Sequence, residues 1–135
     1  MKGAKTNIVI NSKITITIFN ILRDIGLNTS HRGTKYINKA IQLLLTSNND
    51  IFVLENIYIC ITNIYNNTSP KQIKNDISYA LKSRNEEKSK HNFEKIFYFE
   101  YDEYYFTNKT IIEEISHVIL YDLYKIESIN CNKTI

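Results

Sequence analysis

The sequence predicts an all-α protein, a compact bundle of about six helices that contains a helix-turn-helix. The chain has 135 residues with only three glycines and one proline, and isoleucine, leucine and tyrosine recur along it at helical spacing. This length suffices for one domain with a substantial core. We therefore expect a single helical domain over residues 12–126, between a flexible leader at 1–11 and a flexible tail at 127–135.

Two helices are expected before residue 50. Ser12 is the expected N-cap of the first, which covers about residues 13–25 until Gly26 ends it. Alternating Ile and Thr at 14–18 also fit a strand. A polar loop at 27–32 leads to a second helix over about 33–46, and a turn follows at 47–50. The positions expected to face the core are Ile14, Ile18, Ile21, Leu22 and Ile25, then Tyr36, Ile37, Ala40, Ile41, Leu44 and Leu45.

The helix-turn-helix is expected between residues 53 and 82. Its first helix covers 53–65, with an apolar side formed by Leu54, Ile57, Ile61 and Ile64. After a turn at 67–69, Ser69 is the expected N-cap of the second helix and Pro70 its first residue. Gln72 lies three residues after the cap, which is the spacing of a capping box. The buried stripe of this second helix is expected to be Ile73, Ile77, Ala80 and Leu81.

The opposite face of that second helix indicates nucleic-acid binding. It carries Lys71, Gln72, Lys74, Asn75, Ser78 and Lys82. Lysines neutralise phosphates, while Gln, Asn and Ser can hydrogen-bond base edges in the major groove. The alternative is an ordinary solvated face, because the helix-turn-helix pattern alone often matches by chance.

The C-terminal third is expected to be less regular. Residues 84–90 form a charged, exposed link in this interpretation, followed by a short helix at about 92–98 and an extended connection to 106. A hairpin is the alternative for this aromatic segment, which has β propensity and no clean period. The last helix begins at Asn108, with Ile111, Ile112, Ile115, Val118, Ile119 and Leu123 on its apolar side.

Charge is distributed unevenly along the chain. Residues 1–90 carry 13 Lys/Arg against 6 Asp/Glu, whereas residues 91–135 carry 4 against 8. This asymmetry favours a protein with one face on nucleic acid, with chance segregation as the alternative.

Cys60 is expected to be packed, and Cys131 lies in the polar tail. The two form no metal-ligand spacing and no disulfide framework, which fits a reducing cytoplasm. The apolar runs are too short for a signal peptide or a membrane span.

Short motifs in a fixed order extend over about residues 14–123. They are Ile25-Gly26, Arg32-Gly33, Tyr36 with Ala40 and Ile41, Tyr65-Asn66, Ser69-Pro70 with the stripe after it, Thr107-Asn108 and Ile111-Ile112. In this order and spacing they resemble the C-terminal effector domain of the stage-zero sporulation response regulator A family of endospore-forming bacteria. The resemblance implies a bundle of about six helices that binds a short operator box in promoters and activates or represses sporulation genes.

The sequence departs from this family where the family contacts bases. The family has arginines at the positions of Gln72, Asn75 and Ser78, a glutamate at that of Lys74 and a histidine at that of Tyr79. Arginine prefers guanine, whereas glutamine and asparagine prefer adenine. We therefore expect this chain to read a different operator.

Other departures concern the framework. The turn at 67–69 has one extra residue, and Tyr98 stands where the family has glycine. Only about a dozen residues precede the first helix, so we expect no phosphoacceptor receiver domain and no phosphorylation-driven dimerisation.

Catalytic and metal sites are not expected. Glu114 and His117 have the spacing of a metal-ligand pair in a helical bundle, but a second such motif is missing. The carboxylates of Glu100, Asp102 and Glu103 have no partner histidine or nucleophile nearby in sequence. The tyrosines in 98–105 could stack on single-stranded bases, but their acidic neighbours favour packing or a protein contact instead.

The sequence thus predicts a DNA-binding transcriptional regulator, not an enzyme, with no cofactor and no metal. Ser69 and Pro70 position the recognition helix, and Gln72, Asn75 and Ser78 are expected at base edges. The rest of the expected DNA-binding set is Lys71, Lys74, Tyr79, Lys82, Arg32 and Lys35, with the basic side chains on phosphates.

The alternative function is a protein-interaction module without sequence-specific DNA binding. Such a module would titrate the full-length regulator or RNA polymerase through the acidic, tyrosine-rich C-terminal third. The expected partner is double-stranded promoter DNA. RNA polymerase, a homologous regulator and a second copy of the chain on DNA are further candidates, and no membrane is expected.

Overall fold

The computed structural model describes residues 10–47 and 53–133, with side chains described up to residue 122. This part of the chain contains six α-helices, one 3₁₀ turn and no strand, which confirms the all-α prediction. The elements are α1 (Ser12–Asp24), α2 (Arg32–Thr46), α3 (Leu54–Tyr65), α4 (Pro70–Lys82), α5 (Glu86–Phe97), the 3₁₀ turn η2 (Glu103–Tyr105) and α6 (Asn108–Lys133). Residues 1–9 of the leader expected at 1–11, and most of the turn at 47–50, lie outside the described residues.

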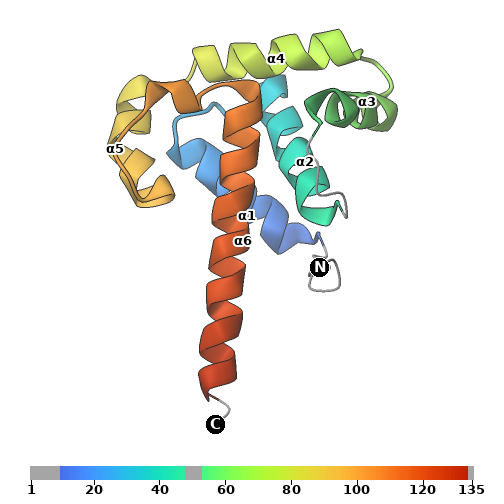
Figure 1. Cartoon of the computed structure of the whole chain (residues 1–135). Coiled ribbons are helices and arrows are strands. Elements are labelled where there is room, and N and C mark those ends of the chain that lie inside the picture. Colours follow the sequence, from blue (N-terminus) through green and yellow to red (C-terminus); the bar gives the residue numbers. More distant parts are fainter. Residues whose placement is uncertain (1–9, 48–52, 134–135) are drawn as a thin grey trace.

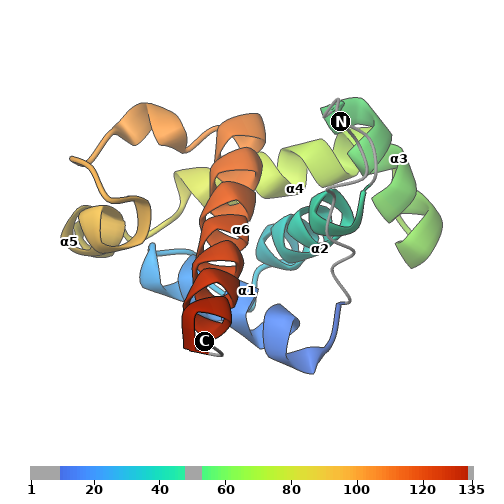
Figure 2. The same ribbon diagram turned by 60° about the horizontal axis from the view of Figure 1, so that its bottom comes forward.

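The helices pack around α2, which contacts α1, α3, α4 and α6. α4 lies across one end of the bundle, and the C-terminal half of α6 extends past the other end (Figure 1). In the turned view, α5 lies on one side of α6 and α3 on the other (Figure 2). One long side of α4 therefore lies at the outside of the molecule.

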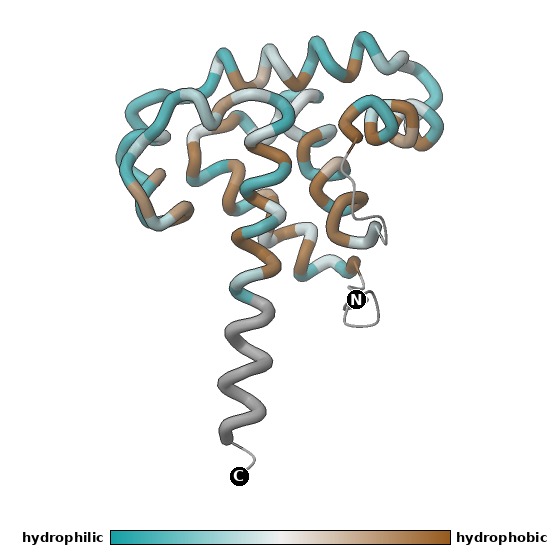
Figure 3. Tube along the Cα trace, in the orientation of Figure 1, coloured by the Kyte–Doolittle hydropathy of each residue, from teal (hydrophilic) through white to brown (hydrophobic). Residues whose placement is uncertain are grey.

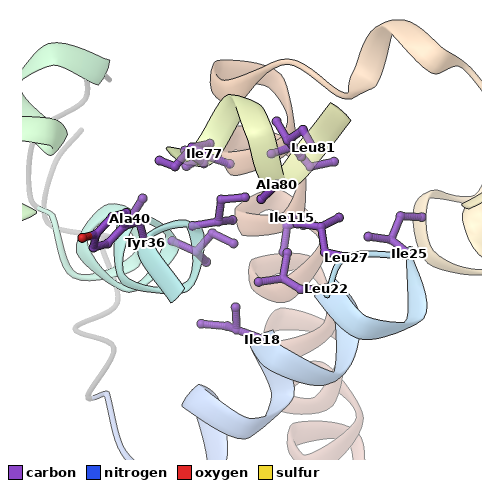
Figure 4. Close-up of a cluster of buried hydrophobic side chains, with 14 of the residues drawn as sticks. Ile18, Leu22, Ile25, Leu27, Tyr36, Ala40, Ile77, Ala80, Leu81 and Ile115 are labelled. Carbon is purple, nitrogen blue, oxygen red and sulfur yellow. The ribbon is translucent and has the colours of Figure 1, made fainter. Parts of the chain in front are cut away.

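The core draws apolar side chains from all six helices. Figure 4 shows Ile18 and Leu22 of α1 lying below Ala80 and Leu81 of α4, with Ile115 of α6 between them. Each buried isoleucine or leucine contributes about 1.5–3 kcal/mol relative to an exposed one. The described positions that the sequence assigned to the core are buried or half-buried, with one exception in α3.

That exception is Ile64, whose side chain is 47% exposed. Tyr58 is buried in its place, and Cys60 is exposed rather than packed. The reason is a rotation of the buried side of α3: Tyr58 and Ile61 face the bundle, and the row through Cys60 and Ile64 faces outward.

α1 begins one residue earlier than expected. Asn11 is its N-cap, with a side chain that accepts from the Ile14 N–H at 3.0 Å, so Ser12 is the first helical residue and not the cap. The strand alternative for 14–18 is wrong. Gly26 ends the helix as predicted, because its φ of 111° allows Leu27 N–H to bond Leu22 O at 2.9 Å and close a Schellman motif.

The prediction of an exposed link at 84–90 is wrong, because α5 begins at Glu86. Asn85 caps it by accepting from the Lys88 N–H at 3.0 Å, and Glu86 and Glu87 lie in its first turn. Ser89 is fully buried and donates to Ile25 O at 2.6 Å. A helix with acidic residues at its positive N-terminal end is favoured by the macrodipole.

The aromatic segment after α5 contains neither a hairpin nor a fully extended chain. Phe93 lies at the centre of a ring cluster that includes Phe97, Phe99, Tyr101, Tyr105 and Phe106. The guanidinium of Arg84 stacks 3.7 Å from the centre of the Phe106 ring. Of the tyrosines considered as base-stacking residues, Tyr101 and Tyr105 belong to this cluster, whereas Tyr98 and Tyr104 are exposed. The expected extended connection is interrupted by η2.

α6 begins at Asn108 as predicted and continues to Lys133. The domain boundary expected at 126 therefore falls within this helix, and residues 127–133 of the expected tail are helical. The described part of the chain contains no helix that is long and apolar enough to span a membrane.

Candidate nucleic-acid interface

The turn between α3 and α4 is built from short polar residues. Asn66 ends α3 with a φ of 66°, a left-handed conformation that asparagine tolerates well. Ser69 then accepts a hydrogen bond from the Gln72 N–H at 3.1 Å, and Pro70 occupies the first helical position. Both predictions for the start of α4 are confirmed, and its direction is set by this cap.

The inner side of α4 is fixed to the bundle. Ile73, Ile77, Ala80 and Leu81 are all buried, as predicted, and α4 contacts α2, α3 and α6. At Gly33 of α2 the two helices approach so closely that a side chain would collide with the Asp76 backbone carbonyl. A helix packed this tightly presents its other side in a fixed orientation.

The outer side of α4 is polar and basic. Lys71, Gln72, Lys74, Asn75, Tyr79 and Lys82 are exposed, and hydrophobic positions lie on the side of α4 that faces the bundle (Figure 3). α4 has 13 residues and is therefore about 20 Å long. A helix of this kind fits the major groove, which is about 12 Å wide.

Ser78 differs from this group, because it is half-buried and faces α6. Its hydroxyl donates to Asn108 Oδ1 at 3.2 Å. The Asn108 amide in turn donates to the Tyr58 hydroxyl at 2.9 Å and to Lys74 O at 3.2 Å. These four residues form a polar node that joins α3, α4 and α6, so the structure places Ser78 in the framework rather than on the outer side.

Gln72 also departs from its expected role in the capping box. Its side-chain amide donates to Asp76 Oδ1 at 2.8 Å, one turn further along α4. The Ser69 half of the box is present and the reciprocal bond from Gln72 is replaced. Asp76 is not among the residues predicted from the sequence, although a glutamine and an aspartate four residues apart are a known helical pair.

Arg32 and Lys35 lie at the N-terminal end of α2, beside the turn that precedes α4. Together with Tyr36, Tyr65, Asn67 and Thr68 they line a hollow of about 370 Å³. The Thr68 hydroxyl oxygen is buried and has no hydrogen-bond partner among the described residues. The two cations beside the positive end of a helix favour an anion here. His31, just before this helix, packs its ring 5.5 Å from that of Tyr79.

The other candidate residues do not assemble a reactive site. Glu114 and His117 form a surface pair at 3.7 Å. No group of three or more potential metal-ligating side chains exists among the described residues. Asp102 instead caps η2 by accepting from the Tyr104 N–H at 2.9 Å.

Comparison with known protein families identifies a match over most of the described domain. The family model described as "Sporulation initiation factor Spo0A C terminal" matches residues 18–119, which is most of the chain. Neither the curated proteins nor the solved structures include a match. The matched region begins in α1, ends in α6 and includes the whole of α3 and α4.

Proposed function

Since the chain belongs to the sporulation initiation factor Spo0A C-terminal family, a family of DNA-binding domains in transcription regulation, we propose that it regulates transcription in the cytoplasm by inserting α4 into the major groove of promoter DNA. One observation carries the proposal. α4 has a fully buried inner side and an exposed outer side with three lysines and two amides. An ordinary surface helix can carry such a face as well, so it is the membership of a DNA-binding family that favours DNA as the partner of this face.

Gln72 and Asn75 are the proposed base readers. Both are exposed on the outer side of α4, and both carry the amide that pairs with the N6 and N7 edge of adenine. Tyr79 is 63% exposed and offers an apolar ring to a thymine methyl group or a sugar. Ser78 is left out of this set because its hydroxyl is bonded to Asn108.

The basic side chains are proposed to hold the DNA backbone. Lys71, Lys74 and Lys82 are spread along α4, and Arg32 and Lys35 flank the hollow beside its N-terminal turn. Cations therefore lie along α4 and beside the turn that precedes it. Phosphate contacts of this kind fix the register of a protein on the duplex and carry no sequence information.

Protein partners stay predictions. Contact with RNA polymerase, with a homologous regulator or with a second copy of the chain on DNA rests on the sequence alone.

The proposal is tested by selection from a pool of random-sequence duplexes. The purified protein is incubated with the pool, and the bound duplexes are sequenced over several rounds. We expect one short motif to be enriched, with adenine at the positions facing α4. The control variant Asn20→Ala, which removes an exposed asparagine on α1, should enrich the same motif as the wild type.

Two results would contradict the proposal. One is the absence of any enriched motif, and the other is a motif that Gln72→Ala and Asn75→Ala both leave unchanged. The first would instead favour a module that contacts other proteins without reading DNA.

A further inference from the structure

Asp76 is the single acidic residue of α4 and lies next to the proposed base readers. Its Oδ1 accepts a hydrogen bond from Gln72 Nε2 at 2.8 Å. The side chain is half-buried, and its second oxygen, Oδ2, is buried with no hydrogen-bond partner among the described residues. A carboxylate beside a DNA-binding face repels phosphates, so its presence calls for a compensating role.

Asp76 stands on a rigid part of α4. Its backbone carbonyl lies against Gly33 of α2, and the neighbouring Ile77 is fully buried. The burial of Oδ2 also restricts the Asp76 carboxylate, whereas the Gln72 side chain is exposed. The hydrogen bond therefore restricts the exposed Gln72 amide, with the Asp76 carboxylate as its fixed partner.

This bond determines what Gln72 can present to a base. A free glutamine amide rotates and offers its oxygen and nitrogen in either order. With one N–H donated to Asp76, the nitrogen is fixed toward the C-terminal part of α4. One N–H and the Oε1 acceptor remain available, and these match the N7 acceptor and N6 donor of adenine.

We propose that Asp76 is a positioning residue that fixes the Gln72 amide for adenine recognition. The inference rests on the proposed function, because it specifies how one of the proposed readers acts. Asp76 contributes to discrimination between bases and opposes the general attraction of α4 for DNA. These two effects have opposite signs, which separates this role from a purely structural one.

The test compares Asp76→Ala with Asp76→Asn. The position read by Gln72 is first identified as the one at which Gln72→Ala loses its base preference. Affinity is then measured on duplexes carrying each base at that position, and on a scrambled duplex. An asparagine keeps an oxygen that accepts the same bond, so it is the conservative variant.

We expect Asp76→Ala to lose about fivefold or more of its adenine preference at that position and to keep its preference at the position read by Asn75. Asp76→Asn should retain most of the preference. Both variants should bind the scrambled duplex at least as tightly as the wild type, because a negative charge has been removed. The double variant with Gln72→Ala should show no further loss beyond Gln72→Ala alone.

A second readout does not involve DNA. The two side-chain amide protons of Gln72 should shift in the NMR spectrum of Asp76→Ala, while those of Asn75 stay in place. An unchanged Gln72 amide signal would overturn the proposal, as would an equal loss of affinity on all duplexes. A wild-type protein with no base preference at any position would overturn the proposed function as well, even if the Gln72 signal shifts.

Discussion

At the scale of single residues, the Asn108 side chain does the most to hold α4 in place. Its two N–H groups go to the Tyr58 hydroxyl and to Lys74 O, and its oxygen accepts from Ser78. Both N–H groups and the oxygen of the Asn108 amide are therefore hydrogen-bonded. Because Lys74 and Ser78 belong to α4 and Asn108 to α6, the node fixes the rotation of α4 about its own axis.

Tyr58→Phe tests this node and its pH dependence. Tyr58 is 4% exposed, and burial raises its pKa above the usual value of about 10. The folded state therefore favours the neutral phenol. The contribution of the neutral Tyr58 phenol to stability is fully present below about pH 10 and is lost as the pH rises through the folded-state pKa. We expect Tyr58→Phe to cost about 0.5–1.5 kcal/mol of unfolding free energy at neutral pH through the lost hydrogen bond.

Above about pH 10, the difference in unfolding free energy between wild type and Tyr58→Phe should narrow, because only the wild type has the Tyr58 phenol to ionise. Urea titrations at several pH values measure this gap. Tyr105, whose pKa is also raised mainly by burial, is present in both proteins and cancels in the comparison. Tyr104→Phe, at a side chain that is 79% exposed, is the control. A gap that is constant between pH 7 and 11 would contradict the assignment.

Tyr98 ends α5 in a left-handed conformation, with a φ of 70°. The resembling family has glycine at this position, which matches the conformation found here. Because a side chain in this region costs about 1–2 kcal/mol, Tyr98→Gly should unfold with about 1 kcal/mol more free energy than Tyr98→Ala.

Urea unfolding of the two Tyr98 variants measures the difference without the lost ring, since both lack it. Glu94 supplies the control, because it is exposed within α5. There, glycine should be less stable than alanine by about 1 kcal/mol. The same sign at both positions would mean that Tyr98 is not in a left-handed conformation.

At the scale of elements, the attachment of α4 depends on its buried stripe. Ile77 is fully buried where α4 packs against its neighbours. Ile77→Ala should cost about 2–5 kcal/mol through lost burial and a cavity, a large share of the 5–15 kcal/mol typical of small domains. Thermal and urea unfolding measure the loss.

Ile16→Ala is the matched control, since Ile16 is 57% exposed on α1. It should change stability by no more than about 0.5 kcal/mol. If the two alanine variants melted alike, Ile77 would be exposed and the outer and inner sides of α4 would be exchanged.

The elements that could be predicted from sequence carry their signals locally. Ser69, Pro70 and an apolar stripe at helical spacing predict α4, and apolar positions repeated at helical spacing predict α2. The start of α5 was missed because its charged first turn resembles an exposed link. Its signals were present: Asn85 as a cap, two acidic residues after it, and Ser89, Phe93 and Phe97 spaced four apart.

The parts of the site that escaped prediction depend on contacts between distant residues. Ser78 has the helical position of an outer residue by spacing, but Asn108 lies 30 residues away in sequence and turns its hydroxyl inward. The hollow at Arg32 and Lys35 likewise needs the α3–α4 turn to lie beside the start of α2. No local pattern encodes either arrangement.

At the scale of the whole molecule, the uneven charge of the chain predicts how DNA binding responds to salt. Each neutralised phosphate contributes about −0.9 to the slope of log affinity against log salt. With the five proposed basic contacts, a slope of roughly −4 to −5 per protomer is expected. Lys71→Ala should reduce its magnitude by about 1, whereas Lys13→Ala, at an exposed lysine on α1, should not. A slope near zero would contradict electrostatic docking.

The central claim is that α4 reads bases with one set of side chains and holds phosphates with another. It is tested most directly by titrating Asn75→Ala and Lys71→Ala against the selected operator and a scrambled duplex, with Asn20→Ala and Lys13→Ala as controls. Asn75→Ala should lose about 1–3 kcal/mol on the operator and little on the scrambled duplex, while Lys71→Ala should weaken both about equally. Asn75→Arg should shift the preference at that position toward guanine. If Asn75→Ala and Lys71→Ala behave identically on both duplexes, α4 is not the recognition helix, even if the protein binds DNA.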